Sequence, residues 1–426
     1  MFDLLIRQGT LVDGTGPVDI AISGDTIKAV EPAIDASARE TVDATGCLVS
    51  PPFVDGHFHM DATLSYGRPR VNESGTLLEG IALWGELKPE LTADAIIERA
   101  LSYCDWATAM GLLAIRSHVD ICDDRLLAVR ALIEVREKVR DRIDLQLVAF
   151  PQDGYFRHPT AADNLARALD LGVDVVGGIP HFEATMEDGR RSVAALCEIA
   201  ADRGLAVDMH CDETDDPMSR HIETLAFETR RLGLQGRVTG SHLTSMHSMD
   251  NYYASKLIAL IAEAEVAAIA NPLINIVLQG RHDSYPKRRG QTRVPELLAA
   301  GVTVGFGQDC VLDPWYSLGT ADMLDVAFMG LHVAQMTSRA DMARCFDLVT
   351  SAPARILGLE GYCITPGATA SLVVLEASDA IEAIRLRATR LAVVARGKLV
   401  ATTAPKKSNL VVSGRPGTVD RRFKIP

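Results

Sequence analysis

Short apolar runs alternate with longer amphipathic stretches through the middle of this chain, and this alternation constrains the fold more than any other feature. The stretches at 92–110, 124–140, 160–171, 192–203 and 217–234 repeat apolar residues at helical spacing. The apolar runs have the length of buried strands and span residues 47–59, 112–119, 144–150, 173–182, 205–210, 237–242, 266–270 and 302–307. Eight strand and helix units within roughly 250 to 300 residues predict an α/β protein with a TIM-like (β/α)8 barrel.

A doubly wound open sheet is the competing fold for such an alternating pattern. Proteins of that fold usually bind their ligand through a glycine-rich turn after the first strand. The first apolar run here, at 47–59, is not followed by such a turn. We therefore favour the barrel.

The two ends of the chain have a different pattern, with short strand-like runs separated by turns. These runs lie at 3–7, 10–12, 19–23 and 26–30, and again at 371–375, 390–395, 397–400 and 410–412. Neither end is long enough to form a core of its own. We expect residues 1–50 and 361–426 to pair as one small β-sandwich domain, with the barrel at 51–360.

Polar residues follow the predicted barrel strands, at the end where barrels of this type carry their active site. Loops begin at these positions in any fold, which accounts for polar residues but not for so many histidines. The set predicts one polar pocket and comprises His57, His59, His118, Asp120, Gln152, Asp153, His181, Glu183, His210, Asp212, Glu213, His242, Asn271, Asn275 and Asp309.

Four residues of this set have the chemistry of metal ligands. His57 and His59 are two residues apart in an extended segment, so both imidazoles project from the same face. Together with His210 and Asp309 they can hold one divalent ion and leave a position open for water. Such an ion lowers the pKa of a bound water from about 15.7 towards 7, which predicts hydrolytic chemistry.

Two further residues are candidates for proton transfer. Glu213 lies three residues after His210 and can reach the site without being a ligand, and His242 can orient or deprotonate the water. In this interpretation Asp309 shares the proton of the water while it binds the ion. Both candidates have a structural alternative: Glu213 lies in the acidic run 212–216, and a lone histidine is more often a core residue.

The composition restricts the partners. The chain has 43 Lys and Arg against 56 Asp and Glu, for a formal charge of −13, so we expect no nucleic-acid partner because there is no basic stripe to replace counterions. A neutral free base needs no such stripe. The eight cysteines are dispersed, the N-terminus lacks a signal sequence and no apolar run has membrane-spanning length. We expect a cytoplasmic protein without a membrane partner.

The run Pro51-Pro52-Phe53-Val54-Asp55-Gly56-His57-Phe58-His59-Met60-Asp61, followed by Ser74-Gly75-Thr76-Leu77, resembles the first-strand signature of the amidohydrolase superfamily, and specifically of its bacterial cytosine deaminases. The resemblance covers nearly the whole chain. It continues through Val148-Ala149-Phe150-Pro151-Gln152, Ile179-Pro180-His181-Phe182-Glu183, His210-Cys211-Asp212-Glu213, Ser241-His242, Met246-His247-Ser248, Asn271-Pro272-Leu273, Leu278-Gln279-Gly280-Arg281, Tyr285-Pro286-Lys287-Arg288-Arg289-Gly290 and Asp313-Pro314-Trp315-Tyr316.

This resemblance implies a role for each site residue. His57, His59, His210 and Asp309 match the ligands of a mononuclear iron or zinc site. Gln152 corresponds to the amide that binds the 2-oxo edge of the pyrimidine, and Trp315 corresponds to a wall of the pocket. Glu213 corresponds to the acid that protonates N3, and His242 corresponds to the histidine near the attacking water. The strand that carries a bridging lysine in two-metal relatives reads 179–183 here without a lysine, which favours one metal. The resemblance also implies a homo-oligomer.

One position departs from the family pattern. Cytosine deaminases typically have a second Asp after the metal-binding one, and a His before it, whereas this chain reads Gln308-Asp309-Cys310. In the family the second Asp lies on the side of the pocket that faces C5 of the pyrimidine. A small apolar thiol at Cys310 would accept a C5 methyl group that a hydrated carboxylate would disfavour. We therefore predict deamination of 5-methylcytosine to thymine, with cytosine and 5-fluorocytosine also accepted.

Several alternatives stay open. Cys310 has two structural interpretations, neutral drift and a packing residue, and a nucleophilic role is less favoured because the metal already supplies the nucleophile. If Cys310 has no role in substrate choice, the alternatives are an ordinary cytosine deaminase or a deaminase of another small ring such as isoguanine or creatinine. Ring opening of a cyclic amide fits less well, since those relatives usually carry the bridging lysine. A barrel without activity, kept as a scaffold, would be expected to have lost a ligand.

Overall fold

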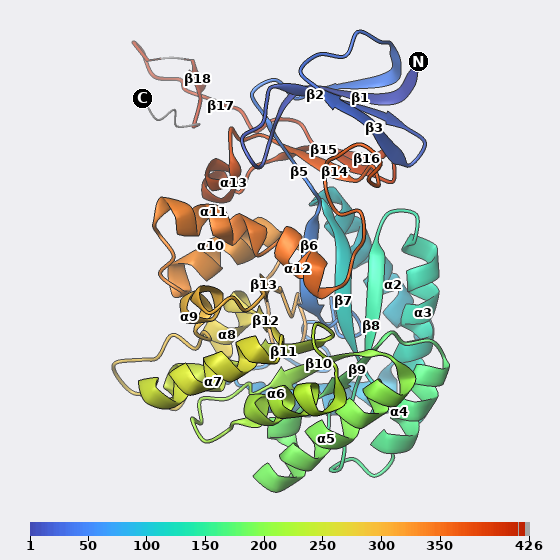
Figure 1. The fold of residues 1–426 in the computed structure, drawn as a ribbon, viewed down its shortest axis with the longest axis vertical. Helices are drawn as coiled ribbons and strands as arrows, with labels where there is room; N and C mark the ends of the chain where they lie inside the picture. Colours follow the sequence, from blue (N-terminus) through green and yellow to red (C-terminus); the bar gives the residue numbers. More distant parts are fainter. Residues whose placement is uncertain (416, 422–426) are drawn as a thin grey trace.

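The structure, a computed structural model, describes residues 1–415 and 417–421 (Figure 1). Its centre is a ring of eight parallel strands in which each strand pairs with the next one along the chain. The expected (β/α)8 barrel is confirmed. The strands are β6 (Phe53–Phe58), β7 (Leu112–Asp120), β8 (Asp144–Phe150), β9 (Val175–Gly178), β10 (Ala206–Cys211), β11 (Val238–His242), β12 (Ala267–Ala270) and β13 (Val304–Phe306).

The ring closes between its first and last strands through the segment that follows β13. The amide of Asp309 donates to the carbonyl of His57 at 2.8 Å, and the amide of His59 donates to the carbonyl of Asp309 at 2.9 Å. Phe58 and Asp309 form a parallel bridge at the same place. The seam of the barrel therefore runs through three of the predicted metal ligands.

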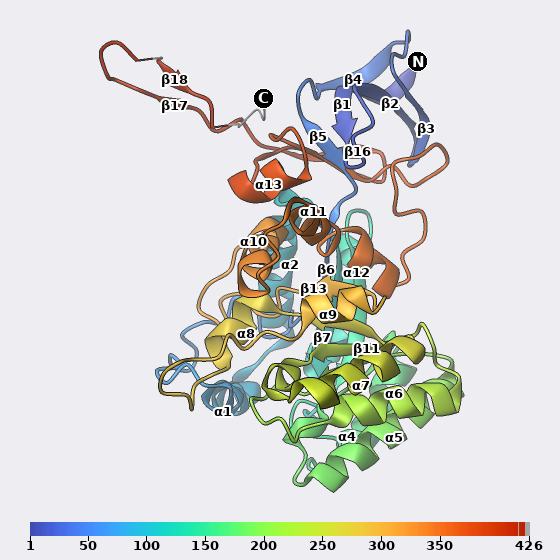
Figure 2. The same ribbon diagram turned by 60° about the vertical axis from the view of Figure 1, so that its left-hand side comes forward.

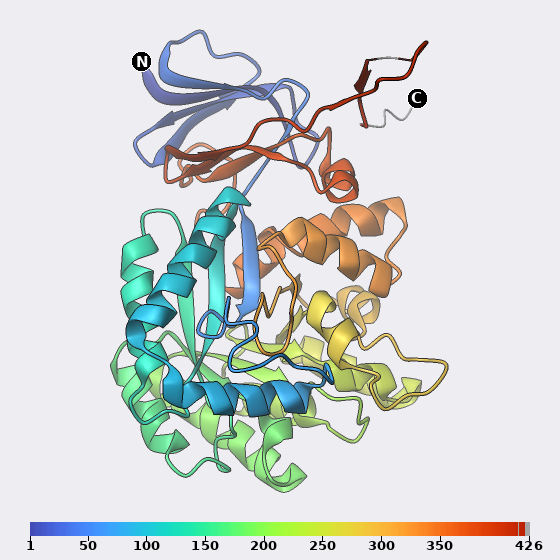
Figure 3. The same ribbon diagram turned by 180° about the vertical axis from the view of Figure 1, so that it is seen from behind.

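Helices cover the outside of the barrel, as Figure 3 shows from behind. Several begin at a Thr, Ser or Asp whose side chain accepts a hydrogen bond from the first turn, as at Thr92 and Asp250. They are α1 (Leu77–Leu87), α2 (Ala93–Ala109), α3 (Leu127–Val139), α4 (Ala161–Asp170), α5 (Met186–Arg203), α6 (His221–Leu232), α7 (Asn251–Glu263), α8 (Pro272–Leu278), α9 (Val294–Ala299), α10 (Met323–Val333), α11 (Arg339–Asp347) and α12 (Ser351–Ile356). Within the described ranges, no helix combines the length and the apolar character that a membrane crossing requires.

Two elements differ from the sequence-based expectation. The strand expected at 173–182 ends at Gly178, and a short 3-10 helix, η2 (Pro180–Phe182), follows because Pro180 has no amide hydrogen for the sheet. The helix expected from residue 192 begins six residues earlier, at Met186. Thr185 caps that start by accepting a hydrogen bond from the amide of Asp188, a capping signal stronger than the apolar periodicity.

The two chain ends form one mixed sheet that folds into a small sandwich, as expected. The strands are β1 (Phe2–Leu11), β2 (Val18–Ser23), β3 (Thr26–Glu31), β4 (Ala38–Asp43), β5 (Leu48–Ser50), β14 (Leu372–Leu375), β15 (Arg390–Ala395) and β16 (Lys398–Thr402). The long strand β1 serves both layers, since its first part pairs with β2 and β4 and its end pairs with β5. Side chains from both termini share the core, among them Ile6, Ile20, Leu372 and Val394.

The end of the chain does not follow the expectation of a strand at 410–412. That segment lies between the short strands β17 (Ser408–Asn409) and β18 (Thr418–Val419), which pair only with each other in a thin arm that leaves the sandwich (Figure 2). Val411 is 99% exposed. The apolar, β-branched sequence favours a strand, but it has no sheet edge to pair with in the described part of the chain. The domain limits at residues 50 and 360 stay a prediction.

A buried ion pair joins the sandwich to the barrel. Arg390 of β15 binds Asp322 through two nitrogens, one of them 3.1 Å from Oδ2, and its Nε donates to the carbonyl of Met110 at 3.0 Å. Asp322 also caps α10 by accepting from the amide of Leu324. The short helix α13 (Ala380–Leu386) precedes this strand. The pair therefore fixes three segments at the domain boundary.

We expect Arg390→Met to lower the free energy of unfolding by about 3 kcal/mol, because removal of one partner leaves a buried carboxylate without its counter-charge. Urea unfolding followed by circular dichroism measures this change. Arg387→Met is the matched control, since Arg387 is only partly buried and lies 3.9 Å from Asp325, too far for a hydrogen bond. Equal midpoints for the two variants would contradict the prediction.

Candidate metal centre and substrate cavity

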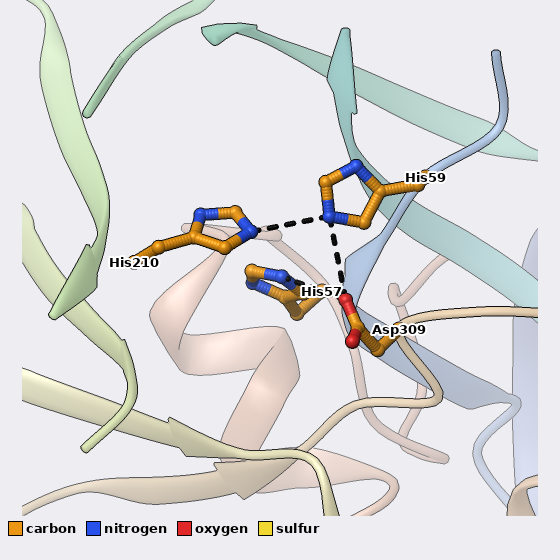
Figure 4. A group of neighbouring side chains, drawn as sticks. All are labelled: His57, His59, His210 and Asp309. Atoms are coloured by element: carbon orange, nitrogen blue, oxygen red, sulfur yellow. Dashed lines mark hydrogen bonds and ion pairs between the residues drawn. The ribbon is translucent and has the colours of Figure 1, made fainter. Parts of the chain in front are cut away.

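Four buried side chains converge (Figure 4) beyond the ends of barrel strands that run away from the sandwich (Figure 1). His57 comes from β6, His59 from the residues just after it, His210 from β10, and Asp309 from the segment after β13. Nε2 of His59 lies 3.1 Å from Nε2 of His210, and Oδ1 of Asp309 lies 3.1 Å from Nε2 of His57 and 3.4 Å from Nε2 of His59. One candidate ligand atom from each residue lies within 4.8 Å of all the others.

These side chains fit a divalent metal ion. Nε2 of His57 and Oδ1 of Asp309 are buried and, although they lie 3.1 Å apart, neither makes a hydrogen bond within the described part of the chain. Two imidazole nitrogens bound to one tetrahedral ion, each at about 2.0–2.1 Å, would be separated by about 3.3 Å, close to the spacing of His59 and His210. Burial and the neighbouring imidazoles hold the pKa of His210 well below its usual range, so its lone pair is free to bind. A set of three imidazoles and one carboxylate suits iron and zinc alike.

The backbone around the ligands is fixed by Asp55. Its Oδ1 accepts hydrogen bonds from the amides of His57 at 3.2 Å and Gln308 at 3.0 Å, which ties the two sides of the seam together. Burial raises the pKa of Asp55 to about 8. Asp309 itself has a positive φ of 67°, a conformation that is uncommon for non-glycine residues but that aspartate adopts more readily than most.

Glu213 and His242 lie beside the ligand set. Oε1 of Glu213 lies 3.4 Å from Nδ1 of His242, and both residues are buried close to Asp309. Burial raises the pKa of Glu213 well above its usual range, and the charge of Asp309 adds to this effect. Burial lowers the pKa of His242 well below its usual range, although the charge of Asp309 opposes this. A protonated Glu213 can donate a proton and a neutral His242 can accept one.

A neighbouring amide orients His242. Nδ2 of Asn275 lies 2.9 Å from Nδ1 of the imidazole. Asn271 also contacts both ring nitrogens, at 3.3 and 3.4 Å. The ring is therefore held in place from the side of β12 and α8.

A small cavity opens next to the ligands. The three residues expected to bind substrate, Gln152, Cys310 and Trp315, all line it and are buried. His242 does not line it. The complete lining is His59, Leu77, Gln152, Ile179, His210, Glu213, Leu278, Asp309, Cys310 and Trp315.

Several members of the expected polar ring do not face the cavity and instead hold loops. Glu183 accepts hydrogen bonds from the amides of Tyr155, Phe156 and Arg157, which fixes the loop after β8. Asp212 binds Nδ1 of His221 at 2.5 Å and so anchors the start of α6. The interpretation of all strand-end polar residues as one pocket is therefore too broad, because the loops above the strands need partners as well.

The sequence did not predict the apolar part of the lining. Leu77, Ile179 and Leu278 come from the start of α1, the end of β9 and the end of α8, and nothing in their local pattern marks them as pocket residues. Asp313 was also missed as an organiser. Its Oδ1 accepts from the amides of Trp315 and Tyr316, each at 2.9 Å. The signal was present in Asp313-Pro314, a dipeptide that favours such a turn.

The model of the amidohydrolase family matches residues 40–401, most of the chain. The chain belongs to the amidohydrolase family. N-isopropylammelide isopropyl amidohydrolase of Pseudomonas sp. (strain ADP) is 30% identical over 406 residues, which cover 94% of this chain and 97% of that protein. Pterin deaminase of Rhizobium rhizogenes is 30% identical over 409 residues, with 93% and 92% covered.

Among solved structures, this amidohydrolase is similar to the 5-methylcytosine deaminase from Klebsiella pneumoniae liganded with 5-fluorocytosine. The two are 40% identical, the TM-score is 0.92, and the match covers 95% of this chain and 99% of the other. The resemblance inferred from the sequence motifs is thereby confirmed. Family membership and these relatives support a hydrolase that acts on C–N bonds, with a buried His and Asp cluster that fits a divalent metal.

Proposed function

We propose that this amidohydrolase deaminates free cytosine-type bases, above all 5-methylcytosine to thymine and ammonia, with cytosine and 5-fluorocytosine as further substrates. The observation that carries the proposal is the lining of the cavity, where the amide of Gln152, the carboxyl group of Glu213 and the thiol of Cys310 surround the space beside the metal ligands. The likeness to a 5-methylcytosine deaminase liganded with 5-fluorocytosine supports it.

Each group of the chain has a task in this reaction. The amide of Gln152 can donate to the 2-oxo group and accept from N1 of the base, while Trp315 covers a face of the ring. One divalent ion, iron or zinc, held by His57, His59, His210 and Asp309, supplies an activated water at neutral pH. As water adds to C4, Glu213 gives its proton to N3 and His242 takes a proton from the water. A second proton transfer to the amino group lets it leave as ammonia.

Cys310 sets the preference at C5. The side chain is 3% exposed, and burial raises the pKa of its thiol well above the usual range, so the group stays neutral. A methyl group placed against it gains about 0.8 kcal/mol from burial. A carboxylate at this position would have to give up its hydration to admit the same methyl group, which costs more than that gain. The thiol therefore admits 5-methylcytosine more readily than a carboxylate at this position would.

We expect the metal-loaded enzyme to turn over 5-methylcytosine with a kcat/KM at least equal to that for cytosine. Cys310→Asp should reverse this order by about 10- to 100-fold, since one buried charge beside a methyl group costs one to three kilocalories per mole, or about that factor. Ammonia release from cytosine, 5-methylcytosine and 5-fluorocytosine measures the ratio. Cys310→Ser, small and neutral, is the matched control and should keep the original order.

The other results have distinct meanings. Efficient turnover of cytosine without turnover of 5-methylcytosine would make the protein an ordinary cytosine deaminase and Cys310 a neutral replacement. Activity on isoguanine or creatinine alone would overturn the choice of ring but not the metal site. A purified protein that binds neither iron nor zinc and gains no activity on reconstitution would be a scaffold.

Two properties of the assembled protein are part of the proposal. We infer a homo-oligomer, as the family resemblance implies, and a cytoplasmic location, as the dispersed cysteines indicate. Light scattering during size-exclusion chromatography measures the first. Both are independent of the choice of substrate.

A further inference from the structure

One wall of the cavity is built by a helix that lies outside the barrel. Leu77, the first residue of α1, lines the cavity. Gly80 allows Trp315 to lie directly against the helix, since a Cβ atom at this position would come within 2.3 Å of the indole. The indole rings of Trp84 and Trp315 pack with their centroids 6.1 Å apart. The position of Trp315 therefore depends on where α1 sits across the end of the barrel (Figure 2).

The same helix is tied to the barrel through Asp120, at the end of β7. Nε1 of Trp84 donates to Oδ2 of Asp120 at 2.8 Å. Lys88, the first residue of the 3-10 helix η1 (Lys88–Glu90), places Nζ 3.0 Å from the same oxygen. The other oxygen of Asp120 accepts from the amide of Cys122 at 2.7 Å, and the amide of Asp120 donates to Asp61 at 2.9 Å. Asp120 is thus a fixed point on the barrel to which α1 is attached.

Lys88 makes a second contact, to the loop that carries Gln152. Its Nζ lies 2.5 Å from Oδ2 of Asp153, the residue after Gln152. The amide of Asp153 in turn donates to the sulfur of Cys122 at 3.4 Å. One ammonium group therefore joins the ends of β7 and β8 and the helix that supports Trp315.

The energetics favour an intact network. The side chain of Lys88 is only 13% exposed, so its charge is largely removed from water. Both carboxylates compensate for this burial, and together they raise the pKa of Lys88 despite it. Without the ammonium, Asp120 and Asp153 would face each other as like charges across the gap that Lys88 now fills. Repulsion would then move the loop after β8 away from α1.

We propose that Lys88 is a positioning residue that sets the separation between the Gln152 and Trp315 walls of the base pocket. The inference rests on the proposed function, in which Gln152 binds the edge of the substrate ring and Trp315 covers its face. Lys88 does not line the cavity. The metal ligands and Glu213 lie on or just after β6 and β10 and after β13, which hold them without Lys88. Loss of Lys88 should therefore affect binding of the base more than the chemical step.

Lys88→Met tests the proposal in the metal-loaded enzyme. We expect KM for the base to rise about 10- to 100-fold, with a change in kcat of less than about threefold and an unchanged metal content. Lys88→Arg should recover most of the loss, since a guanidinium group can contact both carboxylates. Lys138→Met is the matched control, because Lys138 is half-exposed on α3 and pairs with Glu134, one turn away on the same helix. A normal KM, or a fall in kcat accompanied by loss of metal, would overturn the proposal, as would an arginine variant no better than the methionine variant.

A second readout needs no substrate. The chain has three tryptophans, and in a Trp106→Phe background the emission comes from Trp84 and Trp315 alone. We expect Lys88→Met to shift this emission to the red and to increase quenching by acrylamide. Identical spectra of the two proteins would overturn the role of Lys88, whichever ring the enzyme acts on. A shifted spectrum without turnover of any cytosine base would count against the proposed function and leave the role of Lys88 in place. If Lys88→Met does not fold, Asp153→Asn replaces it in both measurements, because it removes one of the two carboxylates that Lys88 contacts.

Discussion

Glu213→Gln is expected to lower kcat for base deamination by about 10³-fold while the metal content stays at the level of the unaltered enzyme. The glutamine side chain has nearly the same size as glutamate but has no acidic proton to give to N3. Glu213 is buried, lines the cavity and lies 3.4 Å from His242, so no exposed acid can substitute for it. Ammonia release under saturating base gives kcat, and elemental analysis of the same sample gives the metal content.

Asp216→Asn is the control for this prediction. Asp216 belongs to the same acidic run but is exposed, and its Oδ1 accepts from the amide of Met218, a bond that asparagine can also make. This variant should keep nearly full activity. A Glu213→Gln enzyme within tenfold of the unaltered enzyme would show that Glu213 is a structural acid, whereas loss of metal in that variant would show that it contributes to the metal centre.

Removal of the metal is expected to abolish deamination and to lower the melting temperature by about 4–5 °C. An ion present at a thousand times its Kd stabilises the folded state by about 4.1 kcal/mol. A chain of this length has an unfolding entropy of about 0.9 kcal/mol/K. Dividing the stabilisation energy by this entropy gives the expected shift in melting temperature of about 4–5 °C. Four buried ligands, three at the barrel seam and one on β10, lose their common partner in the apo form. Scanning calorimetry before and after chelation measures the shift.

Reconstitution separates this effect from damage by the chelator. Iron or zinc added back to the apo protein should restore both activity and melting temperature. His59→Ala should have the lower melting temperature from the start and gain little from added metal. An apo protein that is fully active, or a His59→Ala protein that responds to metal as the unaltered chain does, would contradict the assignment of the ligands.

The barrel could be predicted from the sequence because its strands are short apolar runs with clear limits. β8 begins and ends where the sequence predicted, at Asp144 and Phe150, and the ligand positions follow from strand ends in a barrel. Strand β4 was missed because the run 38–43 is polar and mostly exposed. The sandwich strand expected at 410–412 was wrong because strand formation depends on a partner edge, which no local pattern reveals.

The site was predictable where side-chain chemistry is specific and unpredictable where it is generic. Histidines spaced as His57 and His59 indicate a metal, and Cys310 stood out against a family pattern. Leucines such as Leu77 and Leu278 have no such mark, and their place in the cavity depends on how α1 and α8 pack. The same holds for Lys88, one of many surface-type residues in the sequence until the fold places it between two carboxylates.

The seam between the first and last strands has a consequence for the order of events during synthesis. His57 and His59 leave the ribosome early, whereas Asp309 and the strand before it follow only after most of the barrel has been made. At about 5–20 residues per second this delay is on the order of ten seconds or more. Until then the two histidines have neither the carboxylate nor the backbone bonds that orient them. Metal loading is thus a late step, which requires the chain to be made at least through Asp309.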